Sequence, residues 1–249
     1  MKKEKKIHNA EDVKKIALIT AAGIGSRVGQ DIPKQFLNVY DKPIIMYTLE
    51  CFQKHPEIDA IVVVCLKGWE NVLEAYIKQF NIDKVVAIVP GGSTGFESII
   101  NGTQAIRKMF DDDDIVVVHD GTRASLSADI ISNNLAICIE KGNAITAIPC
   151  VEALAYSEEG NESTKEISRD FVYRTQTPHS FRLKELCEMH KEAKKQGITN
   201  VVAMCSLKMR LGGKIYFSPG SEKNFKITTV DDIEMFKSLL KEEKPDWMK

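Results

Sequence analysis

Short apolar runs alternate along the chain with longer amphipathic stretches. The apolar runs, each bounded by polar or turn-forming residues, are Ile16–Thr20, Ala60–Leu66, Lys84–Val89, Ile115–Val118 and Ala144–Ile148. Runs of this kind are typical of the central strands of a parallel sheet, because helices cover both faces of such a strand. The pattern therefore predicts a buried, mostly parallel sheet.

Helical spacing of apolar residues fills the intervals between these runs. The predicted helices are Ile44–Lys54, Trp69–Gln79, Ser98–Phe110, Ala128–Lys141, Leu183–Gln196 and Val230–Glu242, and two late strands are expected at Lys214–Phe217 and Asn224–Thr228. Alternation of strand and helix implies right-handed crossovers with helices on both faces of the sheet. The sequence thus predicts an α/β fold with a Rossmann-like, mostly parallel twisted sheet flanked by helices.

One segment, at about Val151–Tyr173, breaks this alternation. It is polar, contains the turn-forming sequence EEGNES and has extended-looking flanks, which together predict a β-arm that leaves the main body. A polar arm without a core face of its own needs a partner to cover it, so we expect it to join two copies into a homodimer. No linker or repeat divides the chain, and residues 1–249 are expected to form one domain.

Composition and charge narrow the class of protein. The chain is 43% hydrophobic and 28% charged, as in ordinary globular proteins. Its formal net charge of −1 argues against nucleic acid or an anionic membrane as a partner. The first apolar run is too short to span a bilayer. Six cysteines without zinc-like spacing indicate reduced thiols and a cytoplasmic protein.

The segment that follows the first predicted strand carries the strongest chemical signal. It reads AAGIGSRVGQDIPKQF, and Gly23 and Gly25 permit a tight turn whose backbone N–H groups can face a polyphosphate. Arg27 can fork two phosphate oxygens, and Lys34 adds a point charge. The segment lacks both the ending of a P-loop and the third glycine of the dinucleotide fingerprint. It therefore predicts a triphosphate site of another type.

A second signal lies at the end of the run Ile115–Val118. This strand delivers His119 and Asp120 to the carboxyl edge of the sheet, where α/β proteins bind ligands. Asp120 suits a Mg²⁺ ligand or a contact to a ligand hydroxyl, and Arg123 suits a phosphate group. His119 is expected to be structural.

Five motifs together resemble one enzyme family. They are Ala21–Phe36 described above, GGSTGFESI (91–99), VVVHDGTR (116–123), YRTQTPHSF (173–181) and NFKITT (224–229). The chain resembles, from about Ile16 to Leu240, the cytidylyltransferases that act on 2-C-methylerythritol 4-phosphate or ribitol 5-phosphate, within the nucleotidyltransferase superfamily of glycosyltransferase-A-like fold. The resemblance implies transfer of a cytidylyl group from CTP to a small polyol phosphate, release of pyrophosphate, and Mg²⁺ as cofactor.

The resemblance also implies roles for single residues. Catalysis falls to Arg27, Lys34 and Lys226. The CTP-binding residues would be Ala21, Ala22, Gly23, Ile24, Gly25, Ser26, Gly91, Gly92, Ser93, Ser98 and Gly121. Acceptor binding falls to Asp120, Arg123, Arg169 and Thr177, with Asp120 also as metal ligand. Arg169 matches an arginine that reaches from the arm to the substrate of the other subunit.

The choice of acceptor stays open at this level. The wording Q-T-P-x-S-F is more similar to the ribitol 5-phosphate enzymes, with 2-C-methylerythritol 4-phosphate as the second acceptor. Three places depart from the family pattern: Gly95 stands for an arginine, Glu152–Ala153 for an Asp-Thr pair, and Val202–Cys205 for a segment that contains acidic residues. These changes predict a different polyol, a rearranged metal site, or a nucleotide-binding relative with little turnover.

Overall fold

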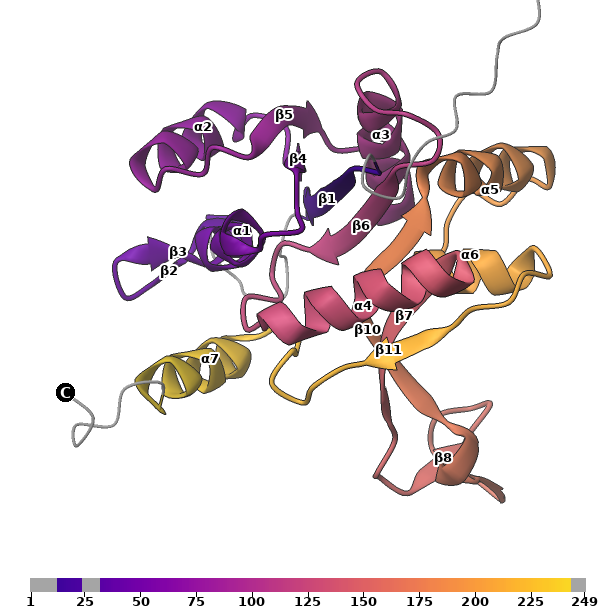
Figure 1. The fold of residues 1–249 in the computed structure, drawn as a ribbon. Coiled ribbons are helices and arrows are strands. Elements are labelled where there is room, and N and C mark those ends of the chain that lie inside the picture. Colours follow the sequence, from indigo (N-terminus) through magenta and orange to yellow (C-terminus); the bar gives the residue numbers. More distant parts are fainter. Residues whose placement is uncertain (1–12, 24–31, 243–249) are drawn as a thin grey trace, which may run out of the picture.

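A seven-stranded sheet forms the centre of the molecule. The computed structural model describes residues 13–23 and 32–242, and the strand order is β11-β7-β10-β6-β1-β4-β5 (Figure 1). The strands are β1 (Lys15–Ala21), β4 (Ala60–Cys65), β5 (Val85–Pro90), β6 (Ile115–Asp120), β7 (Asn143–Pro149), β10 (Tyr173–Arg182) and β11 (Phe217–Pro219). Only β10 runs antiparallel to its neighbours in this sheet. The predicted fold class is confirmed.

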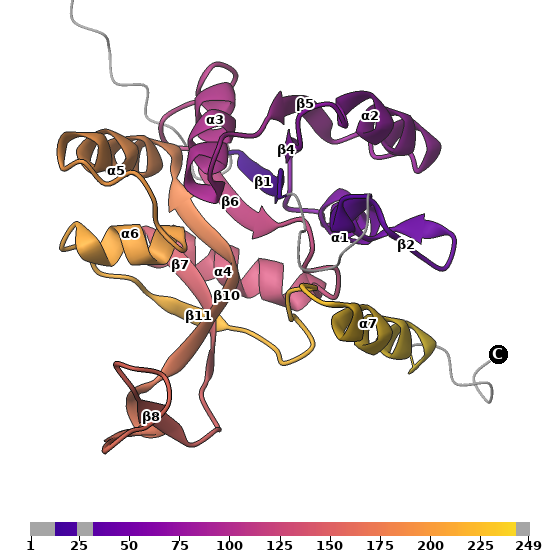
Figure 2. The ribbon, with the colours of Figure 1, turned by 180° about the vertical axis from the view of Figure 1, so that it is seen from behind.

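Helices cover both faces of the sheet. They are α1 (Ile44–Lys54), α2 (Glu70–Gln79), α3 (Gly95–Arg107), α4 (Ala128–Lys141), α5 (Leu183–Lys195), α6 (Met204–Arg210) and α7 (Val230–Glu242). One core cluster packs α1, α2 and α4 against Ala17 and Ile19 of β1, and the other packs α3, α5 and α6 against Ile16 and Leu18. Figure 2 shows α5 and α6 in front of the sheet and α4 behind it. Alternate residues of a strand face opposite sides, which is why one apolar run supports two cores.

Three parallel strands end together where the site lies. In the register of the sheet, Thr20 of β1 aligns with Val64 of β4 and with Asp120 of β6. Because these strands run in the same direction, the loops that follow them leave from one edge of the sheet. The first of these loops is followed by the short 3-10 helix η3 (Lys34–Phe36). A small hairpin of β2 (Asn38–Val39) and β3 (Lys42–Pro43) comes next.

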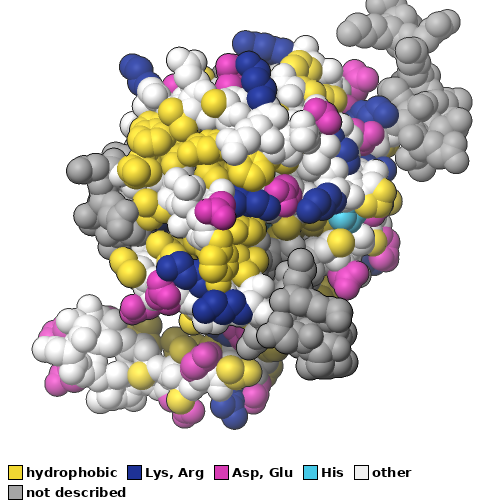
Figure 3. All heavy atoms as spheres, turned by 90° about the vertical axis from the view of Figure 1, so that its left-hand side faces the viewer, with side chains coloured by type: hydrophobic (Ala, Val, Ile, Leu, Met, Phe, Trp, Pro, Cys, Tyr) yellow, Lys and Arg dark blue, Asp and Glu magenta, His cyan; other side chains and the backbone are white. Residues whose placement is uncertain are grey.

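The predicted arm is present. Strands β8 (Leu154–Tyr156) and β9 (Lys165–Ile167) pair in a separate two-stranded sheet, and the 3-10 turn η4 (Arg169–Phe171) follows them. Figure 3 shows the arm at the lower left, separated from the body and covered mainly by polar and charged atoms. Strand β10 carries the chain from the arm back into the main sheet.

The structure corrects several element assignments. Asn224–Thr228 is not a strand: the N–H of Ile227 donates to the Thr122 carbonyl (2.9 Å), but no ladder forms there. Only the last residue of the predicted strand Lys214–Phe217 belongs to β11. Helix α3 begins three residues earlier than predicted, because Thr94 rather than Ser98 caps it. Strand β10 was missed because its sequence mixes polar and apolar residues without regular alternation.

Candidate active site

Two loops far apart in the sequence touch at the carboxyl edge of the sheet. A methyl group placed on Gly91, after β5, would lie only 2.2 Å from the Cβ of Ala22, after β1. The same methyl group would lie 3.3 Å from the hydroxyl oxygen of Ser98. A glycine is therefore required at position 91, because real side chains do not approach so closely. The contact joins two stretches to which the family resemblance assigns CTP binding.

Helix α3 holds the loop that precedes it. The Thr94 hydroxyl accepts from the Glu97 N–H (3.0 Å), while the Glu97 carboxylate accepts from the Ser93 hydroxyl and N–H, both at 2.6 Å. This arrangement is a variant of the capping box, in which Glu97 accepts from the residue before the N-cap Thr94. Hydrogen bonds from the Ser93 hydroxyl and N–H hold the pKa of Glu97 below its usual value. The Ser98 hydroxyl accepts from the Gly92 N–H (3.1 Å) and donates to the Thr94 carbonyl (2.9 Å). We call residues 91–98 the base loop.

A buried glutamine, which the sequence reasoning missed, fixes the loop after β1. The Gln35 amide donates to the carbonyls of Ala21 (2.8 Å) and Gly23 (3.1 Å), and its side chain is almost fully buried. Lys34 precedes it in η3 and is 9% exposed. The sequence signal for this role was the position of Gln35 at the end of the glycine-rich motif. A buried amide needs hydrogen-bond partners, and the backbone of the neighbouring loop can supply them. The predicted site residues Ile24, Gly25, Ser26 and Arg27 lie outside the described residues.

Three charged side chains, which we call the charged cluster, meet at the end of β6. Asp120 accepts through one carboxylate oxygen from Arg123 Nε (3.0 Å) and through the other from Lys226 Nζ (2.9 Å). Arg123 also donates to the carbonyl of Asn224 (2.8 Å). Burial alone would raise the pKa of Asp120, but the Lys226 ammonium and the Arg123 guanidinium hold it well below its usual range. The carboxylate is thus ionised and flanked by two cations.

A neutral histidine lies directly beneath this cluster. The fully buried His119 places Nδ1 3.0 Å from the Thr177 hydroxyl and Nε2 3.2 Å from the Arg123 carbonyl. A carbonyl only accepts, so Nε2 carries the hydrogen and the Thr177 hydroxyl donates to Nδ1. Burial lowers the pKa of His119 to about 4, which keeps the ring uncharged at neutral pH. Because Thr177 also accepts from the Asp120 N–H (3.1 Å), His119 is linked through hydrogen bonds to the backbone of both Asp120 and Arg123.

The remaining predicted residues fall in two places. A methyl group on Gly121 would lie 3.0 Å from the Thr20 carbonyl oxygen, so this glycine packs against the end of β1 beside the loops. Thr48 of α1 donates to the Gly121 carbonyl (3.0 Å). Arg169, in contrast, lies in the arm, where it donates to the Val151 carbonyl (2.7 Å). The structure therefore gathers Gly121 with the site and leaves Arg169 in the arm.

The charged cluster offers a divalent metal one protein ligand, the carboxylate of Asp120. Among residues 13–23 and 32–242, no three His, Cys, Asp or Glu side chains gather where they could hold a metal. Asp120 offers one carboxylate whose two oxygens already accept from cations, yet each oxygen keeps a further lone pair. Mg²⁺ is commonly held by one or two carboxylates together with substrate phosphates. The site thus suits an ion that brings most of its ligands with a triphosphate.

A family model described as "IspD: 2-C-methyl-D-erythritol 4-phosphate cytidylyltransferase" matches residues 15–242. The chain belongs to this family. As an IspD-family protein it is a nucleotidyltransferase of the cytidylyltransferase class, and the predicted family is confirmed. Nowhere in the described part of the chain is a helix both long and apolar enough to cross a membrane.

Several relatives match this IspD-family chain over nearly its whole length. A ribitol-5-phosphate cytidylyltransferase of Lacticaseibacillus paracasei is 40% identical over 91% of the chain and 97% of the relative. A 2-C-methyl-D-erythritol 4-phosphate cytidylyltransferase of Clostridium tetani is 36% identical over 92% and 91%. Among solved structures, the 2-C-methyl-D-erythritol 4-phosphate cytidylyltransferase of Francisella tularensis is 31% identical, with a TM-score of 0.76 over 90% of this chain and 99% of that one.

Proposed function

We propose that this chain transfers the cytidylyl group of CTP to ribitol 5-phosphate and releases pyrophosphate. The observation that carries the reaction is the meeting, at one edge of the sheet, of two glycine loops with the charged cluster. Ribitol 5-phosphate is favoured because relatives that carry this name are 40% and 37% identical to the chain. The second candidate acceptor is 2-C-methyl-D-erythritol 4-phosphate, which the family description and the Clostridium tetani relative support.

The proposed chemistry needs positioning and positive charge more than proton transfer. A phosphate oxygen of the acceptor attacks the α-phosphorus of CTP in line. The new P–O bond forms as the bond from the α-phosphorus to the pyrophosphate oxygen breaks. No general base is required, since a phosphate monoester is largely dianionic at neutral pH. Arg27, Lys34 and Lys226 would stabilise the charge that develops on the transferred group.

We assign the nucleotide to the two glycine loops and the acceptor to the charged cluster. The residues Ala21, Ala22, Gly23, Ile24, Gly25 and Ser26 would face the triphosphate, and Gly91, Gly92, Ser93, Ser98 and Gly121 the cytidine. Arg123 uses two of its five N–H groups in the hydrogen bonds described above, which leaves donors for the acceptor phosphate. Mg²⁺ held by Asp120 and the triphosphate would supply Lewis-acid stabilisation of the phosphates.

We further propose that the chain works as a cytoplasmic homodimer joined by its arms. The arm and its base expose large apolar side chains: Val151, Tyr156, Ile167, Phe171 and Tyr173. Phe171 is 87% exposed, and such exposure on an otherwise polar arm favours coverage by a second copy. Arg169 would then reach the acceptor bound by the other subunit. All six cysteines are free thiols, which supports a reducing compartment.

Pyrophosphate release tests the reaction. The purified chain, with CTP and Mg²⁺, is offered ribitol 5-phosphate, 2-C-methyl-D-erythritol 4-phosphate or no acceptor, and Asp120→Asn serves as the inactive control. We expect the highest kcat/KM with ribitol 5-phosphate. Faster turnover of the methylerythritol compound would replace the proposed acceptor. CTP binding without pyrophosphate release from any polyol phosphate would make the chain a nucleotide-binding relative.

Mixed dimers test the role of Arg169 in the other subunit. Asp120→Asn and Arg169→Ala are each expected to be nearly inactive alone. In an equal mixture that has exchanged subunits, half the dimers are mixed and each holds one intact site, so about a quarter of native activity should return. Absence of any recovery, with exchange verified by differently tagged subunits, would contradict a role across the dimer.

A further inference from the structure

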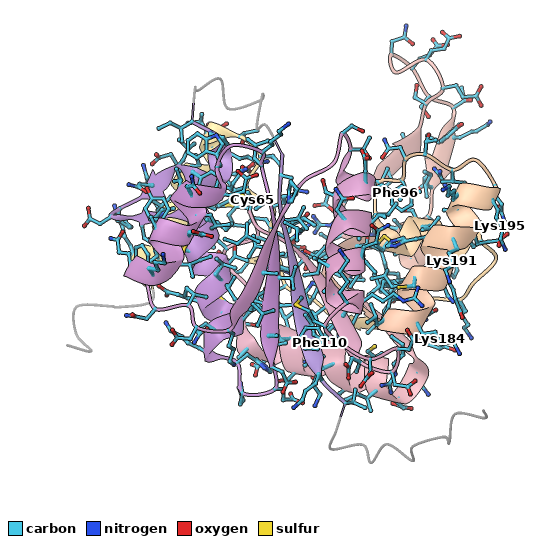
Figure 4. The ribbon with its side chains drawn as sticks, turned by 90° about the horizontal axis from the view of Figure 1, so that it is seen from above. Cys65, Phe96, Phe110, Lys184, Lys191 and Lys195 are labelled. Atoms are coloured by element: carbon cyan, nitrogen blue, oxygen red, sulfur yellow. The ribbon has the colours of Figure 1, made fainter. Side chains whose placement is uncertain are left out.

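A groove of about 520 Å³ lies between α3 and α5. Its apolar floor comes from Phe96 and Ile100 of α3 and from Cys187 of α5. Figure 4 shows α3 and α5 side by side, with Phe96 between them and Lys191 on α5. The groove is separate from the charged cluster, none of whose residues lines it. A volume of this size is in the range of small-molecule sites.

One polar atom in the groove wall is buried without a partner. Nε2 of His190 makes no hydrogen bond with any described residue, although it is shielded from solvent. The His190 ring meets the edge of Phe96 at a centroid distance of 5.7 Å. Burial lowers the pKa of His190 to about 4, so the ring is neutral. The neutral ring therefore adds aromatic surface to the groove wall beside Phe96.

The rim of the groove is predominantly cationic. Arg107 of α3 and Lys191 and Lys194 of α5 line it, while the one lining carboxylate is that of Glu97. Glu97 is already engaged by both donors of Ser93. Arg107 has a distant ion pair of its own with Asp112, at 3.9 Å, but the two lysines make the rim positive. An apolar floor with a cationic rim complements a molecule that has an apolar body and an anionic group.

The groove also touches the base loop. Ser93, Thr94 and Glu97 line one end of the groove, and hydrogen bonds among the same three residues shape the loop. A molecule seated there would alter the hydrogen bonds that position Gly91 and Gly92. Two sites that share a structural element are coupled reciprocally in their binding free energies.

We propose that this groove is a second ligand site, which takes a small aromatic or alicyclic anion and is coupled to nucleotide binding through the Ser93–Glu97 hydrogen bonds. The coupling rests on the proposed function of the base loop, whereas the site itself does not. The anion contacts Lys191 and Lys194, and its apolar body lies on Phe96 and Ile100 beside the His190 ring.

The test uses 8-anilinonaphthalene-1-sulfonate, an aromatic anion whose fluorescence rises on binding. We expect saturable binding to the native chain that weakens about tenfold or more in Lys191→Glu/Lys194→Glu. The matched control is Lys184→Glu/Lys195→Glu, which makes the same charge change on exposed positions of the same helix outside the groove. Figure 4 labels both control lysines. Equal affinity in the two double variants, or no saturable binding to the native chain, would overturn the site.

A second measurement separates the site from its coupling. In an NMR titration with the probe, the ring resonances of His190 should shift, while the ring resonances of the buried His119 should stay fixed. Ile100→Trp, which fills the groove from a partly exposed position, should abolish the shift. With the probe saturating, the Kd for CTP should change about fivefold or more. Displacement of the probe by CTP in a simple competition would place the probe in the nucleotide site and refute the proposal. An unchanged Kd would refute the coupling.

Discussion

The two sides of the proposed active site are built by different physical means. The base loop is shaped by close packing of backbone, where a methyl group on Gly91 would lie 2.2 Å from Ala22, and by hydrogen bonds within the first turn of α3. The charged cluster is instead a balance of one carboxylate and two cations joined at 2.9 and 3.0 Å.

This difference teaches which perturbations each side tolerates. A loop shaped by close backbone packing responds to added volume, and its one carboxylate, that of Glu97, is already satisfied by hydrogen bonds from Ser93. A cluster of charges responds to the loss of a single charge, since the remaining charges are left unpaired in a partly buried place. The nucleotide side should therefore fail by steric change and the acceptor side by electrostatic change.

Asp120→Asn should have the largest effect. It leaves Arg123 and Lys226 adjacent without their shared carboxylate and removes the proposed metal ligand. We expect the activation free energy to rise by roughly 2.7–4 kcal/mol, which lowers kcat/KM about 100- to 1000-fold. Steady-state pyrophosphate release measures it. Near-normal turnover in a folded variant would show that the cluster is not part of the reaction.

The second largest effect should be a loss of stability in acid, caused by two buried histidines, His119 and His179. Burial lowers the pKa of His119 and of His179 to about 4, below the ordinary value of 6.5. The unfolded chain therefore binds protons first, and stability falls as the pH drops from 6.5 towards 4. Asp120, whose pKa is lowered, contributes stability that is lost only at more acid pH, so it does not obscure this range.

The measurement is urea unfolding at about pH 7 and about pH 5. Between these pH values each histidine should lower the free energy of unfolding by about 2 kcal/mol. His179→Leu removes one titrating ring and should reduce the loss by about that amount. An equal loss of stability in the variant would mean that His179 is protonated with little penalty in the folded protein.

Gly91→Ala should damage the nucleotide side by volume alone. Overpacking a tight contact costs roughly 1–3 kcal/mol, so we expect the Kd for CTP to rise about 5- to 150-fold. The charged cluster is untouched, and the salt dependence of the reaction should stay as in the native chain. Isothermal titration with CTP at two salt concentrations tests both points. Unchanged CTP affinity would move the nucleotide away from this loop.

Arg123→Lys should produce a smaller and more selective effect. Lysine keeps the charge but cannot fork a phosphate while it holds Asp120 and the Asn224 carbonyl. We expect the acceptor to lose roughly 1–2 kcal/mol of binding free energy, so its KM should rise about 5- to 30-fold. The KM for CTP should change little. A rise in the KM for CTP alone would reverse the two subsites.

Gly95→Ala is the matched control for Gly91 and the smallest change. Gly95 is the first residue of α3, and a methyl group there meets no atom within 4 Å. Alanine should stabilise the chain by about 0.4–1 kcal/mol, because it restricts the unfolded state more than the folded one. Thermal unfolding measures this, and CTP affinity should not change. Loss of CTP affinity would show that any substitution in the base loop is damaging, not only one that adds volume in a tight contact.

Local patterns in the sequence were sufficient for most of the fold. The helices Ile44–Lys54, Ala128–Lys141 and Val230–Glu242 have the predicted bounds, and the apolar runs became the strands β1, β4, β5, β6 and β7. Apolar periodicity is a property of neighbouring residues, so it can be recognised without knowing the tertiary contacts. The family and the motif residues were predictable for the same reason, since each motif is continuous along the chain.

Only the tertiary structure decided how these motifs meet. Lys226 reaches Asp120 across 106 positions of sequence, and it does so from an irregular segment where a strand was predicted. The Thr177 hydroxyl contacts His119 and the Asp120 N–H, and Gln35 fixes the loop after β1. These pairings depend on where distant loops cross, which local pattern does not encode. The sequence by itself determined the sheet, the helices and the chemical groups, whereas long-range packing decided which groups touch.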